Sequence, residues 1–394
     1  MSKRPNYILP IIIFSQFAGT SIWFAVNAVL PSLILEFDLA IENLAAITSS
    51  IQFGFIIGSL LFALLAVADR FSPSKIFFIS ATLGAVLNLM IIFIPLSLPI
   101  LLGLRFLTGL MLAGIYPVGM KIAADWYEKG LGKALGFLVG ALVLGTAFPH
   151  FLQSLDTILD WRLAIILVSV LAAIGGLLVL FFIPNGPYRK AQQSFQPKTI
   201  FSLFKIKKFK AAAFGYLGHM WELYTFWAFV PIILVYYQKQ HEVLLNTPLW
   251  SFIIIAVGTV GCIIGGLIAL KKGSANVAFY HLLISGLCIL VFPLAIQLPQ
   301  PFFLGYLLIW GWAVIADSPQ LSTLAAKHAP PELVGTGLTM MNSIGFALTI
   351  LSIFTLNITL QYFNLSYAIL ILLVGPILGL ISLFGLKERN LATT

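Results

Sequence analysis

The sequence predicts an all-α membrane protein in which twelve transmembrane helices form two pseudo-symmetric six-helix bundles. Apolar residues make up 60% of the chain and charged residues only 9%, whereas a soluble domain carries about 25% charged residues to cover its surface. The apolar residues fall in twelve long blocks, and glycines and prolines of the first half recur in the second half at nearly constant spacing. Hydrocarbon is therefore the expected solvent for most of the chain.

Each apolar block is long enough to cross a bilayer as a helix, which takes roughly 20 residues for about 30 Å of hydrocarbon. The blocks do not alternate polar and apolar residues over strand lengths, and this argues against a membrane barrel. The spans are expected near residues 8–32, 46–68, 76–95, 98–122, 134–155, 162–184, 211–237, 248–270, 276–296, 302–326, 336–358 and 364–386.

Basic residues are distributed so unevenly between the loops that they predict the orientation. If the N-terminus is cytoplasmic, all of the 22 Lys and Arg residues except Arg105, Arg162 and Lys239 lie on the cytoplasmic side. Inserted helices show this positive-inside bias, so the net charge of +9 reflects topology and does not indicate a nucleic-acid partner. We expect a multi-pass protein surrounded by membrane lipid, with both termini cytoplasmic, in a bacterial inner membrane.

The second half of the chain repeats features of the first. Gly109 and Pro117 of the fourth span match Gly311 and Pro319 of the tenth, at an offset of 202 residues. The longest polar connection separates the halves, so we expect an N-terminal six-helix bundle at 1–184, a basic cytoplasmic linker at 185–210 and a C-terminal six-helix bundle at 211–394. Parallel six-span halves with a site between them are a transporter design, in which rocking of the halves alternates access.

The loop after the second span resembles a signature of the major facilitator superfamily. It reads Ala68-Asp69-Arg70-Phe71-Ser72-Pro73-Ser74-Lys75 and is similar to the family's Gly-x-x-x-Asp-Arg-x-Gly-Arg-Arg motif, with Leu65 and Ser72 in place of its glycines. The fourth span, with Arg105, Gly109, Gly114 and Pro117, resembles the family's Arg-containing fourth helix. The resemblance implies a transporter fold whose halves latch on the cytoplasmic side, with Asp69 and Arg70 as gating residues.

The seventh span carries a buried carboxyl. Glu222 lies roughly 15 Å from the cytoplasmic end of its span at 1.5 Å per residue, close to the bilayer midplane, and His219 lies on the same helix face. Burial disfavours the charged form of a carboxyl, so we predict that Glu222 carries protons, with His219 tuning or relaying them. The alternative is a neutral Glu222 that only holds helices together through hydrogen bonds.

Two further charges lie inside spans. Asp317 of the tenth span lies at a depth similar to that of Glu222, and the family resemblance implies that helices one, four, seven and ten line a central cavity. Asp317 is predicted to couple protons or bind substrate, or alternatively to stabilise a kink at Pro319. Arg105 is predicted to contact the substrate, or alternatively to donate structural hydrogen bonds to the first helix.

The first span is unusually polar, and the seventh is rich in aromatic side chains that carry a polar group. A cavity lined by such residues suits a modest-sized organic solute. The predicted substrate-binding residues are Gln16, Trp23, Asn27, Arg105 and Tyr224. Nothing in the sequence specifies the substrate or the direction of transport.

The sequence lacks the motifs of several other functional classes. The chain has no phosphate loop for ATP, no Cys/His set with metal-ligand spacing and no serine-nucleophile elbow. We therefore expect no cofactor, no metal and no enzymatic activity, and a monomer. The predicted function is secondary active transport of a small-molecule solute, coupled to protons by symport or antiport. The alternatives are an uncoupled uniporter of the same fold, and a non-transporting membrane sensor or intramembrane enzyme.

Overall fold

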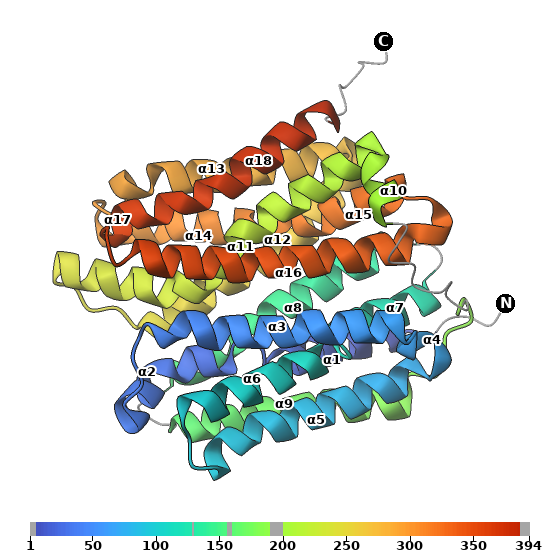
Figure 1. Ribbon diagram of the computed structural model, residues 1–394, viewed down its shortest axis with the longest axis horizontal. Helices are drawn as coiled ribbons and strands as arrows, with labels where there is room; N and C mark the ends of the chain where they lie inside the picture. Colours follow the sequence, from blue (N-terminus) through green and yellow to red (C-terminus); the bar gives the residue numbers. More distant parts are fainter. Residues whose placement is uncertain (1–4, 128–129, 156–159, 190–199, 387–394) are drawn as a thin grey trace.

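The computed structural model describes residues 5–127, 130–155, 160–189 and 200–386 (Figure 1). Within these residues all regular secondary structure is helical, and twelve helical spans are long and apolar enough to cross a membrane. Each overlaps one predicted block, so the all-helical, twelve-span prediction is confirmed.

The helices of the first half are α1 (Ile8–Thr20), α2 (Ala25–Phe37), α3 (Asn43–Leu64), α4 (Val67–Arg70), α5 (Pro73–Phe93), α6 (Leu98–Leu112), α7 (Tyr116–Trp126), α8 (Leu131–Gln153) and α9 (Trp161–Phe182). Those of the second half are α10 (Ile200–Lys205), α11 (Lys207–His241), α12 (Thr247–Lys272), α13 (Ser274–Ala295), α14 (Gln300–Ala316), α15 (Ser318–His328), η2 (Pro331–Leu333), α16 (Val334–Thr359), α17 (Leu365–Ala368), η3 (Ile369–Leu373), α18 (Val374–Leu383) and η4 (Phe384–Leu386). The last predicted linker residues are thus helical, because α10 and the start of α11 fall within 185–210.

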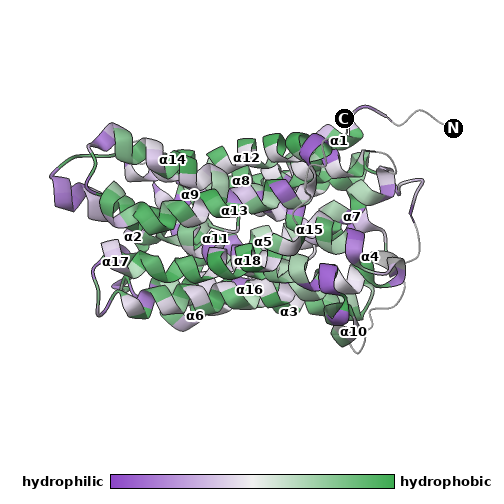
Figure 2. Cartoon of the chain, turned by 90° about the horizontal axis from the view of Figure 1, so that it is seen from above, coloured by the Kyte–Doolittle hydropathy of each residue, from purple (hydrophilic) through white to green (hydrophobic). Residues whose placement is uncertain are grey.

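The two halves lie side by side with their helices roughly parallel (Figure 1). The main contacts between the halves join α8 to α12 and α3 to α16. Apolar residues follow the length of the helices while hydrophilic residues gather at the two ends (Figure 2). Side chains such as Phe93, Phe181 and Ile381 are exposed on this apolar band. Their exposure is expected where hydrocarbon, and not water, surrounds the protein.

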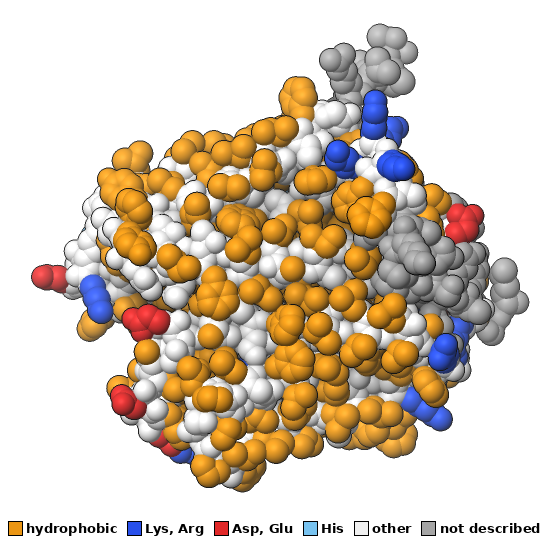
Figure 3. Space-filling model, viewed as in Figure 1, with side chains coloured by type: hydrophobic (Ala, Val, Ile, Leu, Met, Phe, Trp, Pro, Cys, Tyr) orange, Lys and Arg blue, Asp and Glu red, His pale blue; other side chains and the backbone are white. Residues whose placement is uncertain are grey.

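Lys and Arg side chains gather at the end of the molecule that carries α4 and α10 (Figure 3). We call this end the basic end, and the opposite one, near α2 and α17, the distal end. The sequence predicts that the basic end is cytoplasmic.

Three spans are interrupted by turn or bend residues. The first breaks between Thr20 and Ala25, the fourth between Leu112 and Tyr116, and the tenth at Asp317. In the fourth and tenth spans, Pro117 and Pro319 each stand in the first turn of the segment after the break. Proline has no backbone N–H and its ring clashes with the carbonyl four residues earlier. The repeated prolines therefore give the two halves matching breaks.

The repeated glycines Gly109 and Gly311 also have the same packing role in each half. A side-chain carbon on Gly109 would collide with the carbonyl of Ile51 on α3, and one on Gly311 with the carbonyl of Ile254 on α12. Both positions allow two helix backbones to approach closely, as small residues do in membrane bundles.

Candidate functional site

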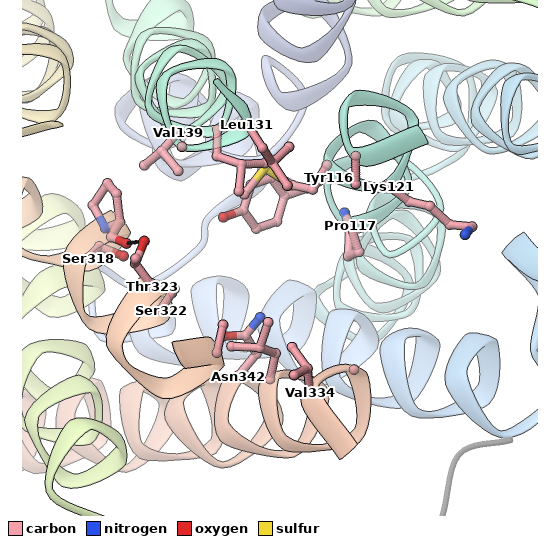
Figure 4. A pocket seen from close by; sticks show the side chains of 18 of the residues that line it. Tyr116, Pro117, Lys121, Leu131, Val139, Ser318, Ser322, Thr323, Val334 and Asn342 are labelled. Atoms are coloured by element: carbon pink, nitrogen blue, oxygen red, sulfur yellow. Dashed lines mark hydrogen bonds between the residues drawn. The ribbon is translucent and has the colours of Figure 1, made fainter. Parts of the chain in front are cut away.

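A cavity of about 1180 Å³ lies between the two halves. Its walls come mainly from α3, α7 and α8 of the first half and from α12, α15 and α16 of the second, with Tyr216 of α11. Tyr116 of α7, Val139 of α8, Ser318 of α15 and Asn342 of α16 surround the same space (Figure 4). Because its lining also includes residues of the loops at the basic end, such as Ala66, the cavity opens at that end.

The two walls of the cavity differ in chemistry. The first half contributes mainly apolar and aromatic groups, among them Phe55, Phe62 and Tyr116. The second half contributes many hydroxyl and amide groups, among them Ser318, Gln320, Ser322, Thr323, Thr339 and Asn342. Charged groups among the described lining residues are Lys121, Asp125, Lys133 and Glu332, which lie in the last turns of α7, at the start of α8 and between α15 and α16. The interior of the cavity is therefore suited to hydrogen bonding more than to ion pairing.

On the distal side the cavity is closed by six aromatic side chains, here called the aromatic plug. Trp23, Phe24 and Phe55 come from the first half, and Tyr224, Trp227 and Phe346 from the second. The ring centroids of Trp23 lie 5.7 Å from those of both Tyr224 and Phe346, and those of Phe55 and Phe346 lie 4.6 Å apart. All six side chains are buried, so the contacts that close the path are contacts between the halves.

One polar contact between the halves lies on the distal side of Phe55 and Phe346. The hydroxyl of Thr349 on α16 donates a hydrogen bond to Oε1 of Gln52 on α3. Gln52 and Thr349 are both fully buried. This bond adds to the apolar contacts that hold the distal side closed.

His219 and Asp317 form a buried pair next to the cavity. Nδ1 of His219 on α11 lies 2.8 Å from Oδ1 of Asp317, and both side chains are only 1% exposed. The contact has the distance of an ion pair and is not a hydrogen bond. Among the described residues, no other group donates to Asp317 or bonds the His219 ring. Tyr216 and Ser318, which are near them in sequence, line the cavity.

Glu222 lies deeper in the second half and does not line the cavity. Its Oε1 accepts a hydrogen bond of 2.6 Å from Nε1 of Trp310 on α14, and its Oε2 accepts one of 2.9 Å from the hydroxyl of Ser285 on α13. Each carboxyl oxygen therefore has a partner, and Glu222 ties three helices of the second half together.

Arg105 is fully buried in the first half. Its guanidinium donates to the carbonyl oxygens of Ile22, at 3.2 Å, and of Trp23, where the first span is broken. It also lies 3.5 Å from Oδ1 of Asn88 on α5. A helix break leaves carbonyls without their usual partners, and Arg105 supplies donors for them. This geometry corresponds to the structural alternative for Arg105.

The other predicted substrate residues do not line the cavity either. Gln16 is fully buried on the side of α1 that meets Gly119 of α7, and Nδ2 of Asn27 donates to Thr48 on α3 at 2.6 Å. Trp23 and Tyr224 belong to the aromatic plug. Of the predicted gating residues, Arg70 is exposed at the end of α4, whereas the side chain of Asp69 lies outside the described part of the chain.

Most of the residues that line the cavity are not among the site residues predicted from the sequence. Tyr116, Ser322 and Asn342 are common residue types with no charge, so depth in the membrane alone did not distinguish them. The spacing of the polar residues in the tenth and eleventh spans was a usable signal, because Ser318 and Ser322 are four residues apart and Thr339 and Asn342 are three apart. Residues so spaced share a helix face.

Comparison with known proteins agrees with the architecture. Residues 12–353 match the Major Facilitator Superfamily. An uncharacterized transporter of Buchnera aphidicola subsp. Schizaphis graminum (strain Sg) is 26% identical over 186 residues, which cover 47% of this chain and 44% of the relative. The chain thus aligns with less than half the length of that relative.

Two solved structures have a similar fold. A mutant of the nucleoside transporter NupG gives a TM-score of 0.72 at 16% identity, covering 97% of this chain and 100% of NupG. A bacterial homologue of the human lysosomal transporter Spinster, in an inward-facing and occupied conformation, gives 0.73 at 14% identity, covering 98% of each chain. From the match over most of its length, this chain belongs to the Major Facilitator Superfamily of transporters.

Proposed function

We propose that the protein is a secondary active transporter that moves a small solute by alternating access and couples this movement to protons. One observation carries the proposal: a cavity between the halves opens at the basic end and is closed distally by side chains from both halves. Rocking of the halves about the central site would separate the aromatic plug and close the basic end. The solute would then leave or enter on the distal side.

The buried pair His219–Asp317 supports proton coupling. Its two members come from different helical segments, α11 and the α14–α15 junction, and both adjoin residues that line the cavity. A proton on Asp317 removes its charge and with it the attraction to a protonated His219. Because the pair's polar atoms have no hydrogen-bond partners among the described residues, a proton or a solute can bind there without breaking a hydrogen bond.

Glu222 completes the proposed coupling site as a third titratable group. It lies three residues from His219 along α11, and its carboxyl is held by Trp310 and Ser285. We assign the exchange of protons with the cavity to Asp317 and His219, and a supporting role to Glu222. None of the three lines the cavity itself. The division follows from their neighbours, because Asp317 directly precedes the lining residue Ser318 and the His219 ring lies 5.8 Å from that of the lining residue Tyr216.

The orientation follows from charge. We assign the basic end to the cytoplasm because Lys and Arg gather there (Figure 3) and inserted helices keep their basic loops on that side. The cavity then faces inward, and both termini are cytoplasmic. In a bacterial cell the protein would lie in the inner membrane, and we propose that it works as a monomer.

The test is transport by purified protein in proteoliposomes. A solute is first identified by thermal shift, since a bound ligand raises the melting temperature by mass action. Wild type should accumulate that solute against its gradient only when a pH gradient is imposed. Asp317→Asn should lose this uphill accumulation while keeping solute exchange, whereas Glu36→Gln, an exposed carboxyl at the distal end, should behave as wild type. Uphill accumulation by Asp317→Asn would show that the coupling site is wrong, and accumulation that ignores the pH gradient would favour a uniporter.

A further inference from the structure

A row of polar side chains runs along α8 on the distal side of the cavity. It consists of Thr146, His150 and Gln153, which are 0%, 2% and 7% exposed. The Thr146 hydroxyl, Nε2 of His150 and Oε1 of Gln153 have no hydrogen-bond partner among the described residues. Buried polar atoms are normally paired, so three unpaired ones on one helix need an explanation.

The row continues the face of α8 that lines the cavity. Leu135 and Val139 line the cavity, and Thr146, His150 and Gln153 follow Val139 at steps of seven, four and three residues. Side chains with this spacing share one helix face. At 1.5 Å per residue, Thr146 lies roughly 10 Å beyond Val139 towards the distal end.

The other faces of α8 are occupied by packing contacts. Phe148 meets Phe17 of α1, with ring centroids 5.2 Å apart, and Phe151 meets Phe252 of α12, also at 5.2 Å. Gly140 faces Thr259 of α12, whose hydroxyl donates to its carbonyl at 3.0 Å. The polar row lies on neither of these faces, so it does not serve the two main contacts of α8.

The same continuation occurs on helices of both halves. Tyr216 of α11 lines the cavity, and Tyr224 and Trp227 follow on its face and enter the aromatic plug. Trp227 is fully buried, and its Nε1 also has no partner among the described residues. Unpaired polar atoms therefore occur in the plug itself, on α11, and further along α8, in different halves.

We propose that Thr146, His150 and Gln153, with Trp227, form a second solute-contact site that lines the path when it opens at the distal end. This inference rests on the proposed function, because the site exists as a lined path only if the halves alternate. The groups are a hydroxyl, an imidazole, an amide and an indole N–H, so the site takes an uncharged solute that both donates and accepts hydrogen bonds. Hydroxyl and amide groups of α15 and α16 offer the same chemistry on the basic side.

Accessibility of single cysteines from the distal side tests the inference without knowledge of the solute. Cys262 and Cys288, both buried and unpaired with each other, are replaced by Ala, and Thr146→Cys, His150→Cys or Gln153→Cys is added. Leu152→Cys is the matched control, because Leu152 is 6% exposed and follows Phe148 on the face towards α1. Thr349→Cys reports opening between the halves. The probes are membrane-impermeant cationic and anionic methanethiosulfonates, added at the distal side of proteoliposomes or cells.

The three row positions should react on the order of tenfold faster than Leu152→Cys, since only they are exposed in the distally open population. Thr146→Cys is a small change and carries the test even where His150→Cys fails to fold. If Thr349→Cys reacts but the row reacts no faster than Leu152→Cys, the second site is wrong and alternating access stands. If neither Thr349→Cys nor the row reacts, both proposals fail.

The charge of the probe tests the solute class. After correction for reactivity with a free thiol, the cationic and anionic probes should react at similar rates at Gln153→Cys, because the row offers no fixed charge. A preference for one sign on the order of tenfold would overturn the assignment to an uncharged solute.

Discussion

The two halves share the breaks of the fourth and tenth spans, but they differ at the first and seventh spans and in the polar groups that they bury there. In the first half Arg105 donates to the carbonyls of a broken helix. In the second half the matching helix α11 runs unbroken from Lys207 to His241 and carries His219 and Glu222. A broken span needs added donors for its freed carbonyls, whereas α11 stays helical throughout although it contains Pro231.

This difference suggests a division of labour. Arginine stays charged and holds a fixed fork of donors, so the polar centre of the first half suits a permanent structural role. The second half buries carboxyl and imidazole groups, which can gain and lose protons, beside the hydroxyl-rich wall of the cavity. Around Arg105 the first half therefore acts as a scaffold, and the second half carries the proposed proton coupling, while α8 of the first half contributes to the proposed second solute site.

The largest effect on stability is expected from removing Arg105, the buried arginine of the first half. Arg105→Gln should lower the free energy of unfolding by about 3 kcal/mol, since hydrogen bonds to a charged donor are lost and buried carbonyls remain unpaired. The measurement is thermal or denaturant unfolding of the protein in detergent. The control is Arg162→Gln, whose side chain is 39% exposed beside Glu36 and Asp160, and which should cost about 0–1 kcal/mol. Equal losses at the two arginines would contradict a scaffold role for Arg105.

The backbone repeat itself is tested at its two matched glycines. Gly109→Ala and Gly311→Ala should each destabilise the protein by about 2 kcal/mol, because the added carbon meets a carbonyl of the neighbouring helix and overpacking costs this much. Unfolding in detergent again gives the measurement.

Matched controls exist six residues earlier in the same two helices. Gly103 and Gly305 have no atom within 4 Å of an added side-chain carbon and are themselves 202 residues apart. Alanine at these positions should leave stability unchanged or raise it by up to about 1 kcal/mol, as its helix propensity predicts. A large difference between Gly109→Ala and Gly311→Ala would mean that the halves do not share one packing design.

The fold could be predicted from the sequence because its main determinants are local. A block of apolar residues specifies a span wherever it lies, and Pro117 and Pro319 directly follow the breaks of the fourth and tenth spans. The break between Thr20 and Ala25 contains neither proline nor glycine. Its carbonyls at Ile22 and Trp23 are bound by Arg105, a residue from another helix, and that contact has no local signal.

The site was harder to predict, because depth in the membrane does not specify the direction of a side chain. Gln16, Asn27 and Arg105 lie at the predicted depths but point at neighbouring helices of their own half. Glu222 likewise points at Trp310 and Ser285. Whether a buried polar side chain faces the cavity or a neighbouring helix depends on how all the helices pack. The sequence of a single span does not contain this information.

A smaller effect is expected from loosening the Glu222 network of the second half. Trp310→Phe keeps an aromatic ring against Phe226, whose centroid is 4.2 Å away, but removes the N–H that donates to Glu222. The loss should be about 1–2 kcal/mol, as for one hydrogen bond to a carboxyl, and transport should persist with its dependence on the pH gradient. Combining Trp310→Phe with Glu222→Gln in a double-mutant cycle should give a non-additive loss, because the two groups share one bond. If Trp310→Phe instead abolished proton-driven uptake at unchanged stability, Glu222 would belong to the proton path itself. The assignment of proton exchange to Asp317 and of a supporting role to Glu222 would then be wrong.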